Sequence, residues 1–160
     1  MIGQPKSDNI TTGYTPRDLQ AKLHMELQRF NVLVCHRRFG KTVFTINHTI
    51  DKALRNPLWK PQYAYIAPNY GQAKRVAWDM LKDFTRNLPG VTTNEQDLRM
   101  DISRPQFGDS ARIMLLGAEN PGSLRGIYLD GCVLDEFAEC DQTIWGQVIR
   151  PALSDRLGWA

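Results

Sequence analysis

Short apolar segments alternate along this chain with longer segments of helical periodicity. The apolar segments are rich in Val, Leu and Tyr and are too short to be helices; they lie at 31–35, 63–67 and 131–134. The segment 41–54, which follows the first of them, repeats apolar residues at three- and four-residue intervals. This alternation favours an α/β fold with a mainly parallel sheet and helices on both faces. In such sheets ligands bind at the carboxyl ends of the strands.

The remaining segments are consistent with a single domain of 160 residues. We expect helices at 16–28 and 72–88, a hairpin of 98–102 with 112–116, and a partly helical segment at 144–153. Trp159 and Ala160 have the pattern of the first residues of another strand, and 1–13 that of a loose arm. We therefore place one domain at 14–160.

Composition excludes several classes of protein. Hydrophobic residues make up 42% of the chain, yet no run approaches the roughly 20 apolar residues of a membrane helix. The three cysteines form no CxxC pair and the histidines have no ligand spacing, so neither a disulfide framework nor a zinc site is expected. Residues 1–90 carry fourteen Lys and Arg against six Asp and Glu, a balance that suits a polyanionic partner or a solvated surface. We expect a cytosolic protein.

The turn between the first expected strand and the helix at 41–54 matches most of a phosphate-binding motif. The motif is a glycine, four free positions, then Gly-Lys and Ser or Thr. Gly40, Lys41 and Thr42 satisfy its end, whereas Cys35 replaces the leading glycine. In such a turn the backbone N–H groups face phosphates, the lysine reaches the β- and γ-phosphates, and the hydroxyl is a ligand for Mg²⁺. The alternative is a plain helix start with an exposed lysine.

Arg37 and Arg38 add positive charge within this turn. Either could stabilise a transferring phosphoryl group as an arginine finger does, and Arg37 is the preferred candidate. The alternative for both is a surface side chain or an ion-pair partner of Asp135 or Glu136.

The apolar run Cys132–Leu134 leads directly into two carboxylates, Asp135 and Glu136. This is the form of a Walker B strand, in which Asp135 would hold Mg²⁺ and Glu136 would orient the attacking water as general base. Adjacent residues of a regular strand point to opposite faces, so the strand must end or turn here to redirect one of them. Alone, such a segment often means only a strand that leaves the core.

Five blocks of the sequence, taken in order, resemble the N-terminal ATPase domain of the large terminase subunits of tailed bacteriophages. They are Tyr14–Gln20, Arg37–Thr42, Tyr65–Pro68 with Gln72–Lys74, Ser123–Gly126 with Leu134–Ala138, and Trp145–Gly158. The family's phosphate-binding turn carries arginines and often lacks the leading glycine, as here. The resemblance implies a RecA-like P-loop NTPase that uses ATP and Mg²⁺.

The resemblance also implies roles for individual residues. Gln20 would read the adenine edge, and Tyr14 or Arg17 would pack near the base. The full expected nucleotide-binding set is Tyr14, Arg17, Gln20, His36, Arg37, Arg38, Phe39, Gly40, Lys41 and Thr42. Lys41, Arg37 and Glu136 would be catalytic, and Thr42 with Asp135 would hold the metal. Arg125 is a possible arginine finger, or else a structural partner of Asp130 or Glu119.

Members of this family translocate double-stranded DNA into a procapsid in the host cytoplasm. They work as a homo-oligomeric ring with a portal protein and a small terminase subunit, and they are absent from the mature virion. They continue past a segment like 145–158 to a coupling motif and a nuclease domain, so the resemblance implies a domain that is truncated at its C-terminus. Two alternatives stay open: another P-loop DNA motor such as a helicase, and a catalytically silent nucleotide-binding or assembly module.

Overall fold

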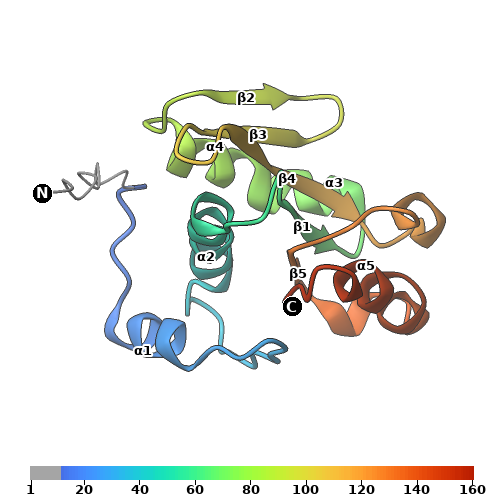
Figure 1. The fold of residues 1–160 in the computed structure, drawn as a ribbon. Helices are drawn as coiled ribbons and strands as arrows, with labels where there is room; N and C mark the ends of the chain where they lie inside the picture. Colours follow the sequence, from blue (N-terminus) through green and yellow to red (C-terminus); the bar gives the residue numbers. More distant parts are fainter. Residues whose placement is uncertain (1–11) are drawn as a thin grey trace, which may run out of the picture.

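A computed structural model describes residues 12–160 as a five-stranded sheet flanked by helices (Figure 1). The strands are β1 Gln62–Ala67, β2 Val91–Asn94, β3 Arg99–Arg104, β4 Asp109–Gly117 and β5 Gly131–Leu134. The α-helices are α1 Asp18–Glu26, α2 Lys41–Arg55, α3 Tyr70–Ala73, α4 Asp79–Thr85 and α5 Arg150–Ser154. Most of the expected arm at 1–13 lies outside the described residues.

The sheet has the strand order β2-β3-β4-β1-β5 and is mixed. Strand β1 pairs in parallel with β4 on one side and with β5 on the other, so the expected parallel pairing is found on both sides of this strand. The other half is antiparallel, because β3 and β4 form the expected hairpin and β2, which we did not predict, pairs with β3. Only part of the sheet is therefore parallel.

Helices cover both faces of the sheet, as predicted. Tyr63 and Tyr65 of β1 point to a core shared with α2 and with the helical segment 70–85. Ala64 and Ile66 point to the opposite face, where a π-helical turn at Trp145–Ile149 and α5 complete a second core. A strand with apolar residues on both faces is what a central strand of an α/β sheet requires.

The expected helix at 72–88 is a continuous helical segment that begins at Tyr70 and ends at Thr85. Its middle, Lys74–Trp78, is a π-helical turn between α3 and α4. Asn69 caps the segment, since its side chain accepts a hydrogen bond from the backbone N–H of Gln72.

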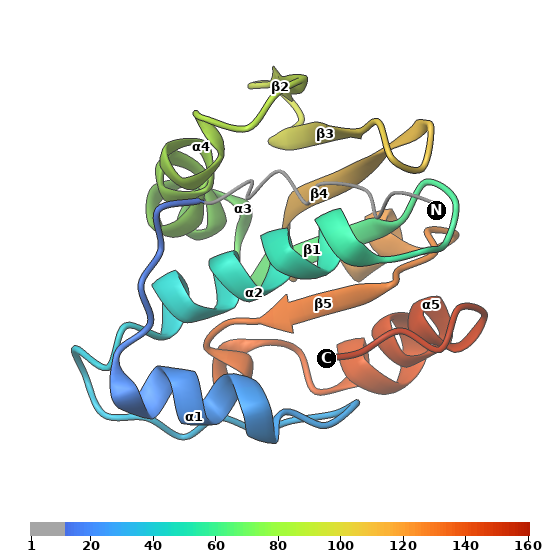
Figure 2. The same ribbon diagram turned by 60° about the vertical axis from the view of Figure 1, so that its left-hand side comes forward.

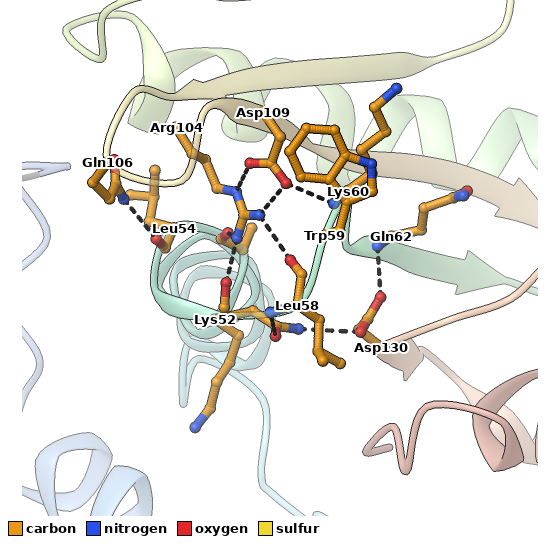
Figure 3. A network of polar contacts seen from close by, with 12 residues as sticks. Lys52, Leu54, Leu58, Trp59, Lys60, Gln62, Arg104, Gln106, Asp109 and Asp130 are labelled. Atoms are coloured by element: carbon orange, nitrogen blue, oxygen red, sulfur yellow. Dashed lines mark hydrogen bonds and ion pairs between the residues drawn. The ribbon is translucent and has the colours of Figure 1, made fainter.

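The C-terminal end of α2 is fixed by a buried ion pair (Figure 3). The side chains of Arg104 and Asp109 have no exposed surface and are joined by two hydrogen bonds of 2.8 and 2.6 Å. The same guanidinium donates to the backbone carbonyls of Ala53, Asn56 and Leu58. The β3–β4 hairpin thereby holds the end of the helix whose other end begins at Lys41.

The predicted strand at 31–35 is wrong. Val32 and Val34 are 91% and 94% exposed, and within the described residues this segment joins no strand of the sheet. In Figures 1 and 2 the stretch between α1 and α2 stays outside the sheet. A β-strand needs a neighbour for its backbone N–H and C=O groups, and β-propensity alone does not supply one.

The backbone that does lie next to this segment is that of Trp159 and Ala160. Asn31 donates to the carbonyl of Ala160, and Ala160 donates to that of Arg29, each at 2.9 Å. On its other side Trp159 forms a parallel bridge with Gly131 of β5. Trp159 and Ala160, which we expected to begin a strand, are thus extended and lie between β5 and the residues that follow α1.

Candidate nucleotide-binding site

The turn at 36–40 leads into the N-terminus of α2. Its backbone closes through a hydrogen bond of 3.4 Å from the N–H of Phe39 to the carbonyl of His36. Gly40 precedes the helix in the left-handed region, at φ 85°, and a Cβ there would come within 2.9 Å of the side-chain nitrogens of Arg17 and Gln20. Glycine therefore fits both the backbone and the space at this position. The first N–H groups of α2 have no partner within the helix, which makes this end suited to an anion.

Helix α1 holds the turn through Gln20, whose side chain is buried. Its amide nitrogen donates to the carbonyls of Phe39 and Gly40, at 3.2 and 3.4 Å. Its amide oxygen accepts from the backbone N–H of Arg17 at 3.0 Å and from the hydroxyl of Tyr14 at 3.4 Å. All four hydrogen-bonding positions of the amide are thus used within the protein. This attachment of the turn was not predicted.

Lys41 and Glu136 face each other across the site. The ammonium nitrogen of Lys41 lies 3.7 Å from a carboxylate oxygen of Glu136, and both side chains are partly exposed. Glu136 follows β5 in the left-handed conformation, at φ 46° and ψ 46°, and begins a 3₁₀ turn at Phe137–Glu139. The change of direction expected at the end of the acidic strand therefore occurs at Glu136.

Asp135 is held by two consecutive residues of β1. Its backbone N–H donates to the carbonyl of Ile66 at 2.8 Å. Its side-chain oxygen Oδ2 accepts a hydrogen bond of 2.6 Å from the hydroxyl of Tyr65. Burial, and next the neighbouring carboxylate of Asp135, raises the pKa of Tyr65, so this hydroxyl stays a donor. The side chain of Thr42 lies near the same hydroxyl and in part opposes this rise of the pKa.

The contact of Tyr65 with the acidic strand end was not predicted, because the apolar run 63–67 identified this residue as core. It is 1% exposed, as a core residue should be. Its position in the sequence could have indicated the contact. Tyr65 lies near the carboxyl end of the strand next to β5, and parallel sheets bind their ligands at that end.

Several of the other expected site residues are exposed and are not tied to this centre by an ion pair among the described residues. His36, Arg37 and Arg38 are exposed, and Arg38 has a positive φ of 68°. Arg125 is also exposed; among the described residues it forms no ion pair with Asp130 or Glu119, the partners of its structural alternative. Asp130 instead pairs with Arg156 at 2.9 Å.

The part of the chain that the structure describes contains neither a cluster of three or more His, Cys, Asp and Glu side chains that could hold a metal ion nor a disulfide. The three cysteines are free thiols, and burial raises the pKa of Cys132 to about 12, which keeps its thiol protonated. None of the described helices is long and apolar enough to cross a membrane.

No family model matches the sequence, but comparison with known proteins finds relatives among phage large terminases. The large terminase subunit of Thermus phage G20c is 27% identical over 162 residues, an alignment that covers 92% of this chain and 33% of that protein. The large terminase ATPase domain of Thermus phage P74-26 has a TM-score of 0.81 at 26% identity, and the match covers 93% of this chain and 64% of that one.

A third similar structure is the large terminase of another thermophilic bacteriophage, in complex with ATP-γ-S. Its TM-score is 0.61 at 20% identity, and the match covers 74% of this chain and 28% of that one, which supports the fold. The chain is therefore related to phage large terminases and has the fold of their ATPase domain, as the sequence resemblance implied. It spans about a third of the length of the curated relatives that it matches.

Proposed function

We propose that this chain binds ATP with Mg²⁺ at the junction of α2 and β5 and hydrolyses it, as the ATPase domain of a viral DNA-packaging motor at residues 14–160. The observation that carries the proposal is the pairing of Lys41 with Glu136 at 3.7 Å beside an Asp135 fixed by Tyr65. A phosphate-binding lysine, a metal-binding carboxylate and a second carboxylate for water are the parts that phosphoryl transfer from ATP requires.

The phosphates would lie on the turn 36–40 and on the free N–H groups of α2, with Lys41 against the β- and γ-phosphates. Lys41 would then bind the phosphates in place of Glu136. The carboxylate of Glu136 would be left to bind the attacking water. Because Glu136 stands on the αL turn after β5, its carboxylate faces the helix N-terminus, where it would orient a water molecule and accept its proton.

Thr42 and Asp135 suit Mg²⁺, because a hydroxyl and a carboxylate are the hard oxygen ligands that this ion prefers, and both contact Tyr65. When bound, the ion would neutralise charge that develops on the phosphates. Arg37 is the arginine of the turn that we propose to reach the transferred group; Arg38 and Arg125 are the next candidates, the latter from the same or a neighbouring subunit.

The nucleoside end of the site would be formed by Tyr14, Arg17 and Gln20, with His36 and Phe39 at the edge of the turn. Gln20 already uses its whole amide to hold α1 against the turn. Reading an adenine edge would therefore require Gln20 to give up one of these bonds. We accordingly propose that nucleobase binding and the conformation of the phosphate-binding turn are coupled through this side chain.

The motor function rests on the terminase relatives and on charge. Residues 1–90 have an excess of eight positive charges, which suits double-stranded DNA, and the helical segment 70–85 exposes Lys74 and Arg75. The partners proposed are a portal protein, a small terminase subunit and further copies of the chain in a ring, within the host cytoplasm.

Steady-state hydrolysis and equilibrium ATP binding, measured together, test the proposal. Glu136→Gln should keep ATP binding and lower turnover by about 10²- to 10⁴-fold, because it removes the general base alone. Glu139→Gln, an exposed neighbour three residues on, is the control and should behave as wild type. Binding without turnover by the wild type would favour the silent nucleotide-binding module, and DNA unwinding driven by ATP would favour a helicase-like motor.

A further inference from the structure

Two tyrosines of β1 lie on the face of the sheet that α2 covers. They are equally buried, but their hydroxyls contact different residues. Tyr63 and Tyr65 are two residues apart, so they point to the same face, and each is 1% exposed. The hydroxyl of Tyr63 donates to the carbonyl of Lys52 at 3.0 Å and accepts from Asn56 at 2.9 Å. These partners belong to the C-terminal end of α2. The hydroxyl of Tyr65 reaches the opposite end, where it meets Asp135 and Thr42.

The register of the sheet explains why Tyr65 reaches Asp135. Strands β1 and β5 are parallel, with Tyr65 opposite Val133 and Ile66 opposite Leu134. The next residue, Asp135, is still attached to β1 through the carbonyl of Ile66 at 2.8 Å. The backbone and the carboxylate of Asp135 are therefore both held by β1, and the acid cannot change its direction without breaking one of these bonds.

The hydroxyl of Tyr65 also determines which oxygen of Asp135 is free. It occupies Oδ2 at 2.6 Å, while among the described residues no hydrogen-bond donor reaches Oδ1. A carboxylate held through one oxygen offers the other to a cation in a fixed direction. The side chain of Thr42 lies near the same hydroxyl, so Tyr65 neighbours both of the proposed oxygen ligands.

We propose that Tyr65 is a positioning residue for Mg²⁺: its hydroxyl aligns the Asp135 carboxylate with the Thr42 hydroxyl so that both face one metal position. The inference rests on the proposed function, because it concerns the metal of the nucleotide site. It deepens that function by assigning the spacing of the two metal ligands to one buried hydroxyl. Partners that orient metal ligands typically change metal affinity by about 10- to 100-fold when they are removed.

The test measures how binding of a fluorescent ADP analogue depends on Mg²⁺ concentration, in wild type, Tyr65→Phe and Tyr63→Phe. Tyr65→Phe should raise the Mg²⁺ concentration at half-maximal binding by roughly 10-fold. Its affinity for the analogue in EDTA should equal that of wild type, because the phosphate-binding turn is untouched. Tyr63→Phe is the matched control, since it removes an equally buried hydroxyl from the same strand.

A purely structural role for Tyr65 predicts a different pattern. Both variants would then lower the melting temperature, and both would leave the Mg²⁺ midpoint at the wild-type value; equal midpoints overturn the proposal while the proposed function stands. Failure of folded wild type to bind the analogue, with or without Mg²⁺, overturns the proposed function and the role of Tyr65 with it. A shifted midpoint in Tyr65→Phe alone supports both.

Discussion

The two sides of the candidate site are built in different ways. On the acidic side, Asp135 and Glu136 follow a paired strand, and β1 holds Asp135 through both backbone and side chain. On the basic side, the stretch 32–36 before the phosphate-binding turn pairs with no strand of the described residues, and Val32 and Val34 are exposed. There the turn is held from outside the sheet, by α1 through Gln20.

The difference indicates where the site can move. A carboxylate fixed by a central strand shares the stability of the sheet, whereas a turn attached by side-chain hydrogen bonds can open locally at lower free energy. We therefore expect the metal-binding side to be preformed and the phosphate-binding side to be adjustable.

Breaking the buried ion pair that anchors the far end of α2 should have the largest effect. Arg104→Met leaves the Asp109 carboxylate without its partner and should lower the free energy of unfolding by about 3–5 kcal/mol. Arg112→Met is the control: it breaks a pair with Asp101 on the same hairpin that is partly exposed, and should cost at most about 1 kcal/mol. Chemical denaturation measures the free energy of unfolding of both variants. If Arg104→Met loses no more than Arg112→Met, the buried ion pair does not anchor the end of α2.

Acid should destabilise the protein through two histidines that pack between α1 and α2. His48 of α2 lies against His24, Phe44 and Trp159, and burial, with Lys52 and His24 next and Asp51 opposing, lowers its pKa to about 4. The pKa of His24 is lowered too, mainly by burial. The unfolded chain, with a histidine pKa near 6.5, then binds more protons than the folded one between pH 6.5 and about 4.

The free energy of unfolding should accordingly fall as the pH drops through this window, by at most about 2 kcal/mol from pH 7 to pH 5 for His48. His48→Gln should remove most of that slope, whereas His36→Gln, at an exposed position of the turn, should leave it unchanged. Thermal unfolding at a series of pH values measures the slope. A slope that persists in His48→Gln would contradict the assignment.

Loosening the turn should have the smallest effect on overall stability and a clear local one. Gln20→Ala removes the bonds to the carbonyls of Phe39 and Gly40 and should cost about 1 kcal/mol. Hydrogen exchange should quicken at 36–42 and stay unchanged in β1 and β5. Gln28→Ala, an exposed residue just after α1, serves as the comparison. Equal protection of 36–42 in both variants would mean that α1 does not hold the turn.

The sequence was sufficient for the parts of the molecule whose structure is decided locally. The helix that starts at Lys41, the strand that ends at Asp135 and the change of direction at Glu136 all follow from periodicity and local turn geometry. The segment 31–35 shows the limit, because a run with strong β-propensity becomes a strand only where another strand accepts its hydrogen bonds.

Contacts between segments that are distant in the sequence also could not be predicted from local sequence patterns. The hydrogen bond from Tyr65 to Asp135 spans 70 positions, and that from Gln20 to the turn spans about 20. Each depends on the packing of two elements whose relative placement no sequence period encodes. The roles predicted for the site residues, among them Tyr14, Lys41, Asp135, Glu136 and Arg125, remain predictions.

The most direct test of the account is the affinity of the folded chain for Mg²⁺-ATP, compared between wild type, Lys41→Ala and Lys52→Ala. Both lysines lie on α2, but Lys41 faces Glu136 whereas Lys52 is exposed near the other end of the helix. The account predicts that Lys41→Ala weakens binding by about 10- to 100-fold, the value of a charge-assisted bond to phosphate, and that Lys52→Ala binds as wild type. Equal affinities for all three proteins would contradict a phosphate site at the start of α2.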